Sequence, residues 1–227
     1  MKKAAIIVAA GSGSRMGAQL PKQYMQLQGK PVIVHTLERF RRFDPQMKIV
    51  VVLAPSHREL WERLVAGFEV NKGLILAEGG ASRFESVKNG LSFFDRDAGN
   101  LLIGIHDAVR PLVSQDTLLR SYEAADSEGS GIPVIEMEES VRRLDKQVGS
   151  FHMDRSMLKR VQTPQVFSLE RILKAYKQAY NPVFTDDASV YESLYGTLTL
   201  VEGNRENIKI TTPTDLQLAS LLITSFG

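Results

Sequence analysis

The sequence predicts a doubly wound α/β domain built on a mostly parallel sheet. Five apolar, β-branched runs alternate with stretches that have the spacing of amphipathic helices. The runs are apolar throughout, which is typical of strands that helices cover on both faces. Repeated β-α alternation of this kind favours parallel strands joined by helical crossovers. A chain of 227 residues can bury a full hydrophobic core, so we expect a single domain over residues 1–227.

The elements of the repeating unit can be placed in chain order. Two of the predicted helices follow serines, Ser82 and Ser114, whose hydroxyls can cap a helix N-terminus. The predicted helices cover residues 31–43, 57–68, 82–94 and 114–127. The predicted strands cover residues 5–10, 48–54, 73–78, 100–107 and 129–135.

The alternation stops after residue 135, where a charged and weakly periodic segment begins. Short alternating runs at 140–144 and 150–153 flank a turn at 145–149, which predicts a β-hairpin. We therefore expect a protruding β-arm at about 136–160, which could serve as a flexible loop, an arm or part of an interface. Beyond it the pattern predicts a helix over 168–180, short strands over 197–201 and 207–210, and a closing helix over 213–224.

Composition excludes several classes of protein. The net charge of +2 without long runs of one sign argues against nucleic-acid and membrane-surface partners. The absence of cysteine excludes disulfides and thiolate metal sites. The basic start before residues 4–10 imitates a secretory signal, but the run is short and a glycine loop follows it, which favours a buried first strand. No apolar run approaches the ~20 residues of a membrane-spanning helix, and we expect a cytoplasmic protein.

A glycine-rich loop, residues 11–17, follows the first predicted strand. Glycines let backbone N–H groups approach phosphate oxygens, and the following helix start favours an anion. Arg15 and Lys22 add two cations, as a bound triphosphate would require. The alternative is an ordinary turn with surface cations. Met16 occupies the third glycine position of the dinucleotide fingerprint, which excludes a Rossmann dehydrogenase, and the Gly-Lys-Ser/Thr end of a P-loop is missing.

Five further sequence motifs follow the glycine loop, and their order along the chain is characteristic. They are Gly79–Arg83 with Ser86-Val87, His106–Pro111, Gln162–Gln165, Thr185–Ser189, and Val201–Gly203 with Asn207–Lys209. Together they resemble the 2-C-methyl-D-erythritol 4-phosphate cytidylyltransferase family of glycine-loop nucleotidyltransferases, from about Ala5 to Ala219. The resemblance implies a Rossmann-like nucleotidyltransferase fold. It also implies a Mg²⁺-dependent transfer of CMP from CTP to the polyol phosphate, with release of pyrophosphate, in non-mevalonate isoprenoid biosynthesis.

The resemblance also implies roles for individual residues. Catalytic roles would fall to Arg15, Lys22, Arg155 and Lys209. The nucleotide would be bound by Ala9, Ala10, Gly11, Ser12, Gly13, Gly80, Ser86 and Asp107, of which Asp107 would also hold the metal. The polyol phosphate would contact Arg110, Ser140, Arg155 and Lys209.

Two further implications concern the arm. The 136–160 segment would cross to a second subunit and complete its pocket, which makes a homodimer the expected state. Ser140 stands where the family usually has threonine; it keeps the hydroxyl and loses a methyl group.

Without the resemblance, several of these residues have simpler interpretations. Asp107 could cap the next helix, Arg110 could form a structural salt bridge, and Lys209 and Arg155 could be solvated surface charges. Arg83 could be a charge on a helix surface. Two other functions stay open: a ribitol 5-phosphate cytidylyltransferase, against which the Asp154-Arg155-Ser156 run argues, and a nucleotide-binding module without catalysis.

Overall fold

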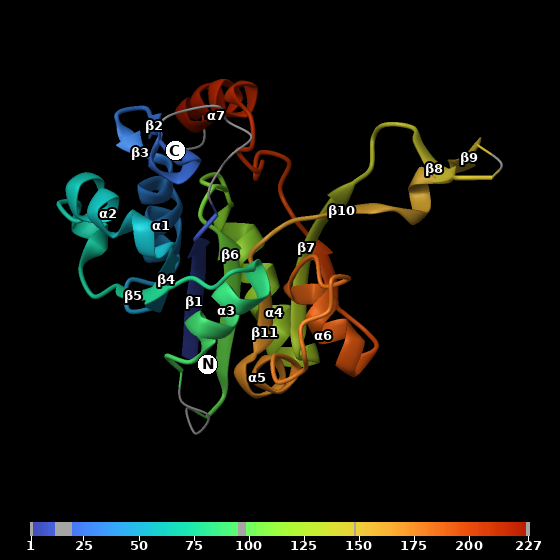
Figure 1. Ribbon diagram of the computed structural model, residues 1–227, viewed down its shortest axis with the longest axis horizontal. Helices are drawn as coiled ribbons and strands as arrows, with labels where there is room; N and C mark the ends of the chain where they lie inside the picture. The colour runs from blue at the N-terminus through green and yellow to red at the C-terminus, as the bar shows by residue number, and fades with distance from the viewer. Residues whose placement is uncertain (1, 12–19, 95–98, 148, 226–227) are drawn as a thin grey trace.

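The computed structural model describes residues 2–11, 20–94, 99–147 and 149–225. Ser12, Gly13 and Arg15 therefore lie outside the described residues. The chain forms a sheet with helices on both faces and a long arm that projects from one side (Figure 1). The described strands make an eight-stranded sheet in the order β10-β7-β11-β6-β1-β4-β5, with β12 also paired to β7.

Most of the sheet is parallel. The strands are β1 Lys2–Ala9, β4 Lys48–Leu53, β5 Ile75–Glu78, β6 Leu101–Asp107, β7 Ser130–Glu136, β10 Lys159–Val161, β11 Gln165–Ser168 and β12 Leu200–Glu202. β1 runs parallel to both β4 and β6, so that Ile6 lies between Val50 and Ile105. β10 and β11 run antiparallel to their neighbours. The predicted doubly wound, mostly parallel fold is confirmed.

The alternation of side chains along β1 divides the core between the two faces of the sheet. Ala5 and Ile7 pack with helices α1 (Val32–Phe43), α2 (Arg58–Leu64) and α4 (Gln115–Glu128). Ala4 and Ile6 pack with α3 (Arg83–Leu91), α5 (Leu169–Ala175) and α6 (Asp187–Tyr195). Because β1 is covered on both faces, its run is apolar without interruption. The closing helix α7 (Pro213–Ser225) packs on a smaller cluster beside β2 (Gln26–Leu27) and β3 (Lys30–Pro31).

Several sequence predictions are wrong in detail. The helix expected over 57–68 is the seven-residue α2, preceded by a 3₁₀ turn, η3 (Pro55–His57). The helix expected over 168–180 ends at Ala175; the ring of the next residue, Tyr176, stacks on Phe84 of α3 at 4.7 Å, and its hydroxyl donates to Asp187 of α6. Residues 207–210 form no strand, because side-chain hydrogen bonds hold this segment instead. Strands β10 and β11 and helix α6 were not expected.

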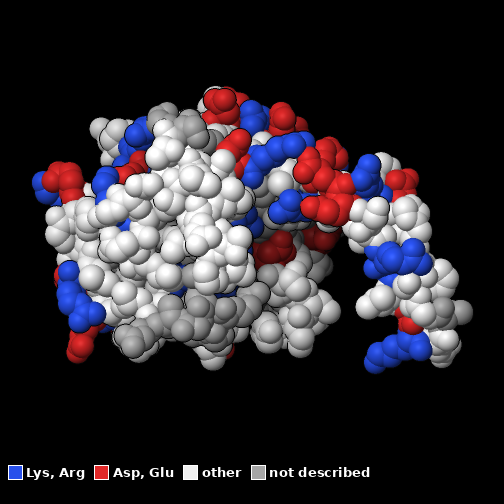
Figure 2. Space-filling view, turned by 90° about the horizontal axis from the view of Figure 1, so that it is seen from above, with Lys and Arg blue, Asp and Glu red and all other residues white. Residues whose placement is uncertain are grey.

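The predicted hairpin is confirmed as β8 (Val141–Asp145) and β9 (Gly149–Met153), which pair in antiparallel fashion. The hairpin is carried by β7 and β10, whose ends are joined by the Lys159–Glu136 ion pair. Seen from above, the arm curves away from the body and leaves an open concavity between the two (Figure 2). Among the described helices none has the length and apolar character needed to cross a membrane.

Candidate active site

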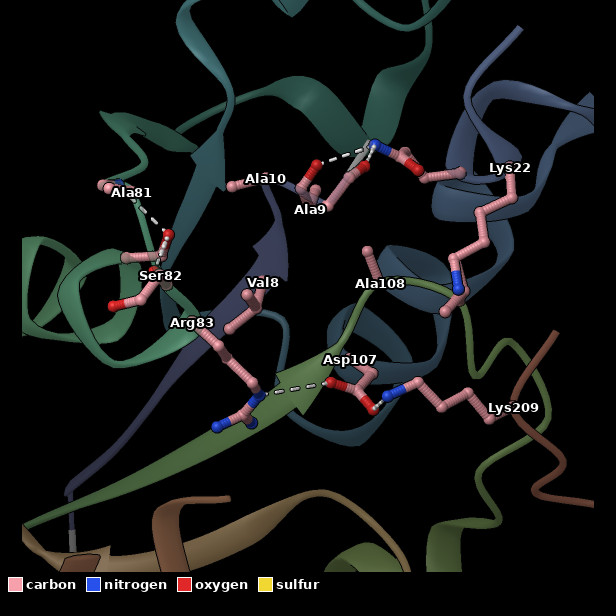
Figure 3. A pocket seen from close by; sticks show the side chains of 15 residues that line it. Val8, Ala9, Ala10, Lys22, Ala81, Ser82, Arg83, Asp107, Ala108 and Lys209 are labelled. Carbon is pink, nitrogen blue, oxygen red and sulfur yellow. Dashed lines mark hydrogen bonds and ion pairs between the residues drawn. The ribbon is translucent and has the colours of Figure 1, made fainter. Parts of the chain in front are cut away.

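A cavity of about 460 Å³ opens at the carboxyl ends of β1 and β6 (Figure 3). Ligands of open α/β sheets bind at this edge, where loops from neighbouring strands meet. Segments far apart in the chain share its wall. They are residues 8–11 at the end of β1, Lys22 and Gln23 of the 3₁₀ turn η2 (Lys22–Tyr24), residues 80–83 and 86 at the start of α3, residues 107–109 at the end of β6, and Lys209.

The start of the glycine loop and Lys22 are held together by a buried glutamine. The Gln23 side-chain amide donates to the carbonyl of Ala9 (2.7 Å) and to that of Gly11 (3.1 Å). Lys22 is thereby fixed at the cavity wall, and in Figure 3 its side chain points toward Ala108. Sequence reasoning assigned no role to Gln23, because a glutamine after a lysine carries no signal of a contact fourteen residues away.

The turn before α3 forms the opposite wall. The Ser86 hydroxyl accepts from the Gly80 N–H (3.1 Å) and donates to the Ser82 carbonyl (2.8 Å). A Cβ on Gly80 would lie 2.4 Å from the Glu85 Cβ, so this close turn requires glycine. Ser82 caps α3 in a capping box with Glu85, as its predicted cap position required.

Asp107 is the electrostatic centre of the cavity. It ends β6, and its side chain is 11% exposed. Its carboxylate lies 2.9 Å from the Lys209 Nζ, 3.5 Å from the Arg110 Nε and 3.8 Å from the Arg83 Nε. Burial alone would raise the pKa of Asp107, but the charges of Arg83, Lys209 and Arg110 together hold it well below its usual range. The carboxylate is therefore ionised at neutral pH.

Arg83 has a stronger partner than Asp107. Its guanidinium donates two hydrogen bonds to the fully buried Asp187 carboxylate, at 2.9 and 2.6 Å. The Tyr176 hydroxyl donates to the same carboxylate at 2.6 Å. Arg83 thus joins α3 to the start of α6 and is no solvated surface charge. The acidic pair Asp186-Asp187 was the available sequence signal, but sequence alone did not pair it with Arg83.

Arg110 lies behind Asp107 and does not belong to the residues that line the cavity. Its guanidinium donates to the Asn207 carbonyl at 2.7 Å, and its side chain is 12% exposed. These contacts match the alternative of a structural salt-bridge residue. A direct contact between Arg110 and the polyol phosphate stays a prediction.

The two expected site residues on the arm lie apart from this cavity. Ser140 and Arg155 are exposed, and neither belongs to the cavity lining. The Arg155 guanidinium donates to the carbonyl of Glu138, within the arm itself. A contact of these two residues with substrate stays a prediction.

The expected magnesium site can be tested against the available ligands. Among the described residues lining the cavity, Asp107 is the one carboxylate. No group of three or more His, Asp or Glu side chains gathers elsewhere in the described ranges. Mg²⁺ is commonly bound by one or two carboxylates together with substrate phosphates and water. Asp107 fits that pattern as a protein ligand to a magnesium–nucleotide complex.

The mostly parallel sheet, the contact between the Lys22 segment and the start of the glycine loop at Gly11, and the charged cavity at the carboxyl edge define the class of protein: a doubly wound nucleotidyltransferase. The model of the 2-C-methyl-D-erythritol 4-phosphate cytidylyltransferase family matches residues 3–225. The chain belongs to that family, and it is an enzyme of the cytidylyltransferase type. The resemblance seen in the sequence blocks is confirmed.

Individual relatives agree with this placement. The 2-C-methyl-D-erythritol 4-phosphate cytidylyltransferase of Bacteroides fragilis is 48% identical over 225 residues, covering 98% of this chain and 100% of the relative. That of Bacteroides thetaiotaomicron is 45% identical over 223 residues, with the same coverage. The solved enzyme from Francisella tularensis is 32% identical, with a TM-score of 0.79 over 97% of this chain and 99% of its own. The 4-diphosphocytidyl-2C-methyl-D-erythritol synthase from Anaerococcus prevotii is 25% identical, with a TM-score of 0.83 over 98% and 96%.

Proposed function

We propose that this protein transfers CMP from CTP to 2-C-methyl-D-erythritol 4-phosphate in non-mevalonate isoprenoid biosynthesis. A phosphate oxygen of the polyol phosphate attacks the α-phosphorus of CTP. The bond from that phosphorus to the bridging oxygen breaks, and pyrophosphate leaves with its electron pair. The observation that carries the proposal is the single cavity that Lys22, Asp107 and Lys209 share at the carboxyl edge of the sheet.

The reaction needs no general base. A phosphate monoester has a second pKa near ~6, so the attacking oxygen is already ionised at neutral pH. His106, the histidine beside Asp107, is unsuited to that role because burial lowers its pKa to about 4. Its ring nitrogens lie 3.1 Å from the Thr163 hydroxyl and 3.1 Å from the Arg110 carbonyl, so both are engaged. The protein's contribution is position and charge.

The barrier to be overcome is electrostatic. Two like charges about 4 Å apart repel by roughly 4 kcal/mol at an effective dielectric of ~20, and a phosphate dianion must approach a triphosphate. Lys22 and Lys209 supply positive charge from two segments of the cavity wall that are far apart in the sequence. Lys22, with Arg15, would meet the charge that develops at the α-phosphorus. Lys209 would hold the attacking phosphate. Magnesium, held by Asp107 and brought in with the nucleotide, would draw charge from the phosphates.

The function is tested by pyrophosphate release from four nucleoside triphosphates, each combined with 2-C-methyl-D-erythritol 4-phosphate or ribitol 5-phosphate. We expect release with CTP and the methylerythritol substrate in the presence of Mg²⁺. Faster turnover of ribitol 5-phosphate would support the other polyol cytidylyltransferase. CTP binding without release under any combination would support a module without catalysis. Because both proposed substrates are charged metabolites that do not cross membranes unaided, we also propose a cytoplasmic location.

The pH dependence of kcat/KM should reflect the ionisation of the polyol phosphate and not that of a protein group. As the pH falls through about 6, the polyol phosphate takes up a proton and loses its best attacking form, so kcat/KM should fall. Asp107 should not contribute, because its lowered pKa keeps it ionised throughout that range. A pH–rate profile measured from pH 5 to 8 checks this. A break in kcat/KM near pH 7 or above would indicate a protein group that acts as base.

We further propose that the arm, residues 136–160, completes the active site of a second copy of this chain. The arm exposes apolar side chains that a partner would cover, with Leu144 82% and Met157 81% exposed. It also carries Ser140 and Arg155, the site residues that lie away from the cavity of their own chain. Crossing to a neighbour would bring them to a cavity.

Deletion of residues 140–156 should therefore leave a monomer with a raised KM for the polyol phosphate. The apolar surface of the arm and the contacts of Arg155 would both be lost, while the CTP cavity stays intact. Sedimentation and steady-state kinetics measure the two effects. A deleted protein that stays dimeric and fully active would refute the role of the arm. Met157→Ser alone, which keeps the arm, should weaken dimerisation without removing Arg155.

A further inference from the structure

A network of buried hydrogen bonds, here called the polar frame, joins Asn207 to Gln162, Thr163 and Arg110 behind the cavity. Asn207 has no exposed surface. Its side-chain amide donates to the Thr163 carbonyl at 2.9 Å and to the Gln162 side-chain oxygen at 3.4 Å. Both acceptors belong to the segment between β10 and β11. The side chain therefore fixes the chain after β12 to the antiparallel part of the sheet.

The backbone of Asn207 extends the frame toward the charged cluster. Its carbonyl accepts from the Arg110 guanidinium at 2.7 Å and from the Gln162 amide at 3.4 Å. Gln162 donates in addition to the Asn204 carbonyl at 2.8 Å. The frame is tight at this point, because a Cβ on Gly203 would lie 2.3 Å from the Gln162 Oε1. Arg110 in turn faces Asp107, so one asparagine is linked to both.

Lys209 follows Asn207 by two residues on a segment without a strand ladder. The next anchor along the chain is Ile210, whose N–H donates to the Val109 carbonyl at 2.9 Å. A lysine side chain is a flexible four-carbon stem that ends in a point charge, and that of Lys209 is 41% exposed. The 2.9 Å approach of its Nζ to Asp107 therefore depends on where Asn207 and Ile210 hold the backbone.

We propose that Asn207 is a positioning residue for cytidylyl transfer, acting through Lys209 without touching substrate. The inference rests on the proposed function and adds to it a residue outside the cavity lining. The side chain of Asn207 makes its hydrogen bonds through the amide nitrogen, since its Oδ1 has no hydrogen-bond partner among the described residues. Asn207→Asp keeps the shape but turns both donations into contacts between a carboxylate and an oxygen acceptor.

The test is a mutant cycle in a protein whose wild-type turnover has first been established. Asn207→Ala and Asn207→Asp should each lower kcat/KM for the polyol phosphate by about 10²-fold, the effect of a misplaced catalytic group, while KM for CTP stays within about threefold. In a Lys209→Met background, Asn207→Ala should cost less than about threefold further, because the group it positions is gone. Failure of wild-type turnover would refute the proposed function. Normal wild-type turnover with full activity in a folded Asn207 variant would refute only the role of Asn207.

A matched control separates position from stability. Asn71 is partly buried; its amide donates to the Ala66 carbonyl and its oxygen accepts from the Trp61 indole, away from the cavity. Asn71→Ala should lower the melting temperature and leave kcat/KM unchanged. Losses that multiply fully in the Asn207→Ala/Lys209→Met double variant would overturn the inference, since they would show an effect independent of Lys209. If Asn207→Ala does not fold, the same cycle with Asn207→Asp decides the question.

Discussion

Lys22→Ala is expected to lower the kcat of CTP-dependent transfer by about 10² to 10⁴, the range for loss of a charge-stabilising donor in phosphoryl transfer. Lys22 lines the cavity, and the Gln23 amide holds its segment against the start of the glycine loop. Its charge is therefore in place before the substrate binds, so little energy is needed to reorganise it in the transition state. Arg15→Ala should have an effect of the same size, although Arg15 lies outside the described residues.

Single-turnover kinetics at saturating CTP measure this loss without interference from binding. Lys72→Ala is a suitable control, because Lys72 is an exposed lysine paired with Glu69 and neither residue lines the cavity. The control should retain wild-type turnover. Turnover at the wild-type rate by Lys22→Ala would remove Lys22 from the mechanism.

Asp187→Ala is expected to destabilise the fold by about 3–5 kcal/mol, the cost of breaking a buried ion pair from one side. Asp187 is fully buried and binds Arg83 through both carboxylate oxygens. Its removal leaves Arg83 with the more distant Asp107, at 3.8 Å, and leaves the Tyr176 hydroxyl without its acceptor. Helices α3 and α6 would lose their polar connection beside the cavity.

Urea unfolding gives the free energy directly. Glu69→Ala provides the contrast, since the Glu69–Lys72 pair is 84% and 78% exposed and such surface pairs contribute about 0–1 kcal/mol. A loss of less than 1 kcal/mol in Asp187→Ala would mean that the Arg83 connection does not stabilise the fold.

The alternating strands and helices of residues 2–135 were predictable, because strands buried on both faces appear in the sequence as uninterrupted apolar runs. β1 and β4 are uninterrupted apolar runs, since their alternate residues enter opposite halves of the core. The strands that were not predicted, β10 and β11, have a weaker sequence pattern. β10 is three exposed residues, Lys159–Val161, and β11 is four residues, so neither shows a period. Helix α6 begins at a capping box on Asp186 and Ser189, which lie in the Thr185–Ser189 block that carries the family resemblance.

The residues of the candidate site also fall into those that the sequence predicted and those that it did not. Lys22 was expected beside a bound phosphate because it follows the glycine loop after the first strand, whereas the role of Asp107 was implied by the family resemblance. Gln23, Arg83 and Asn207 could not be assigned. Their roles depend on partners 14, 104 and 44 residues away, and no local pattern encodes such contacts. The strand expected over 207–210 was wrong for the same reason, because distant side-chain partners replace the ladder.

A crystal structure of the full chain with CTP and Mg²⁺ tests most directly whether one cavity holds the reacting nucleotide. We predict the triphosphate at the carboxyl ends of β1 and β6, with Lys22 within hydrogen-bond distance of its oxygens and Asp107 beside the metal. The cytosine should lie against the turn of Gly80 and Ser86. Nucleotide bound elsewhere, with the Lys22–Asp107–Lys209 cavity empty at saturating CTP, would contradict cytidylyl transfer at this site.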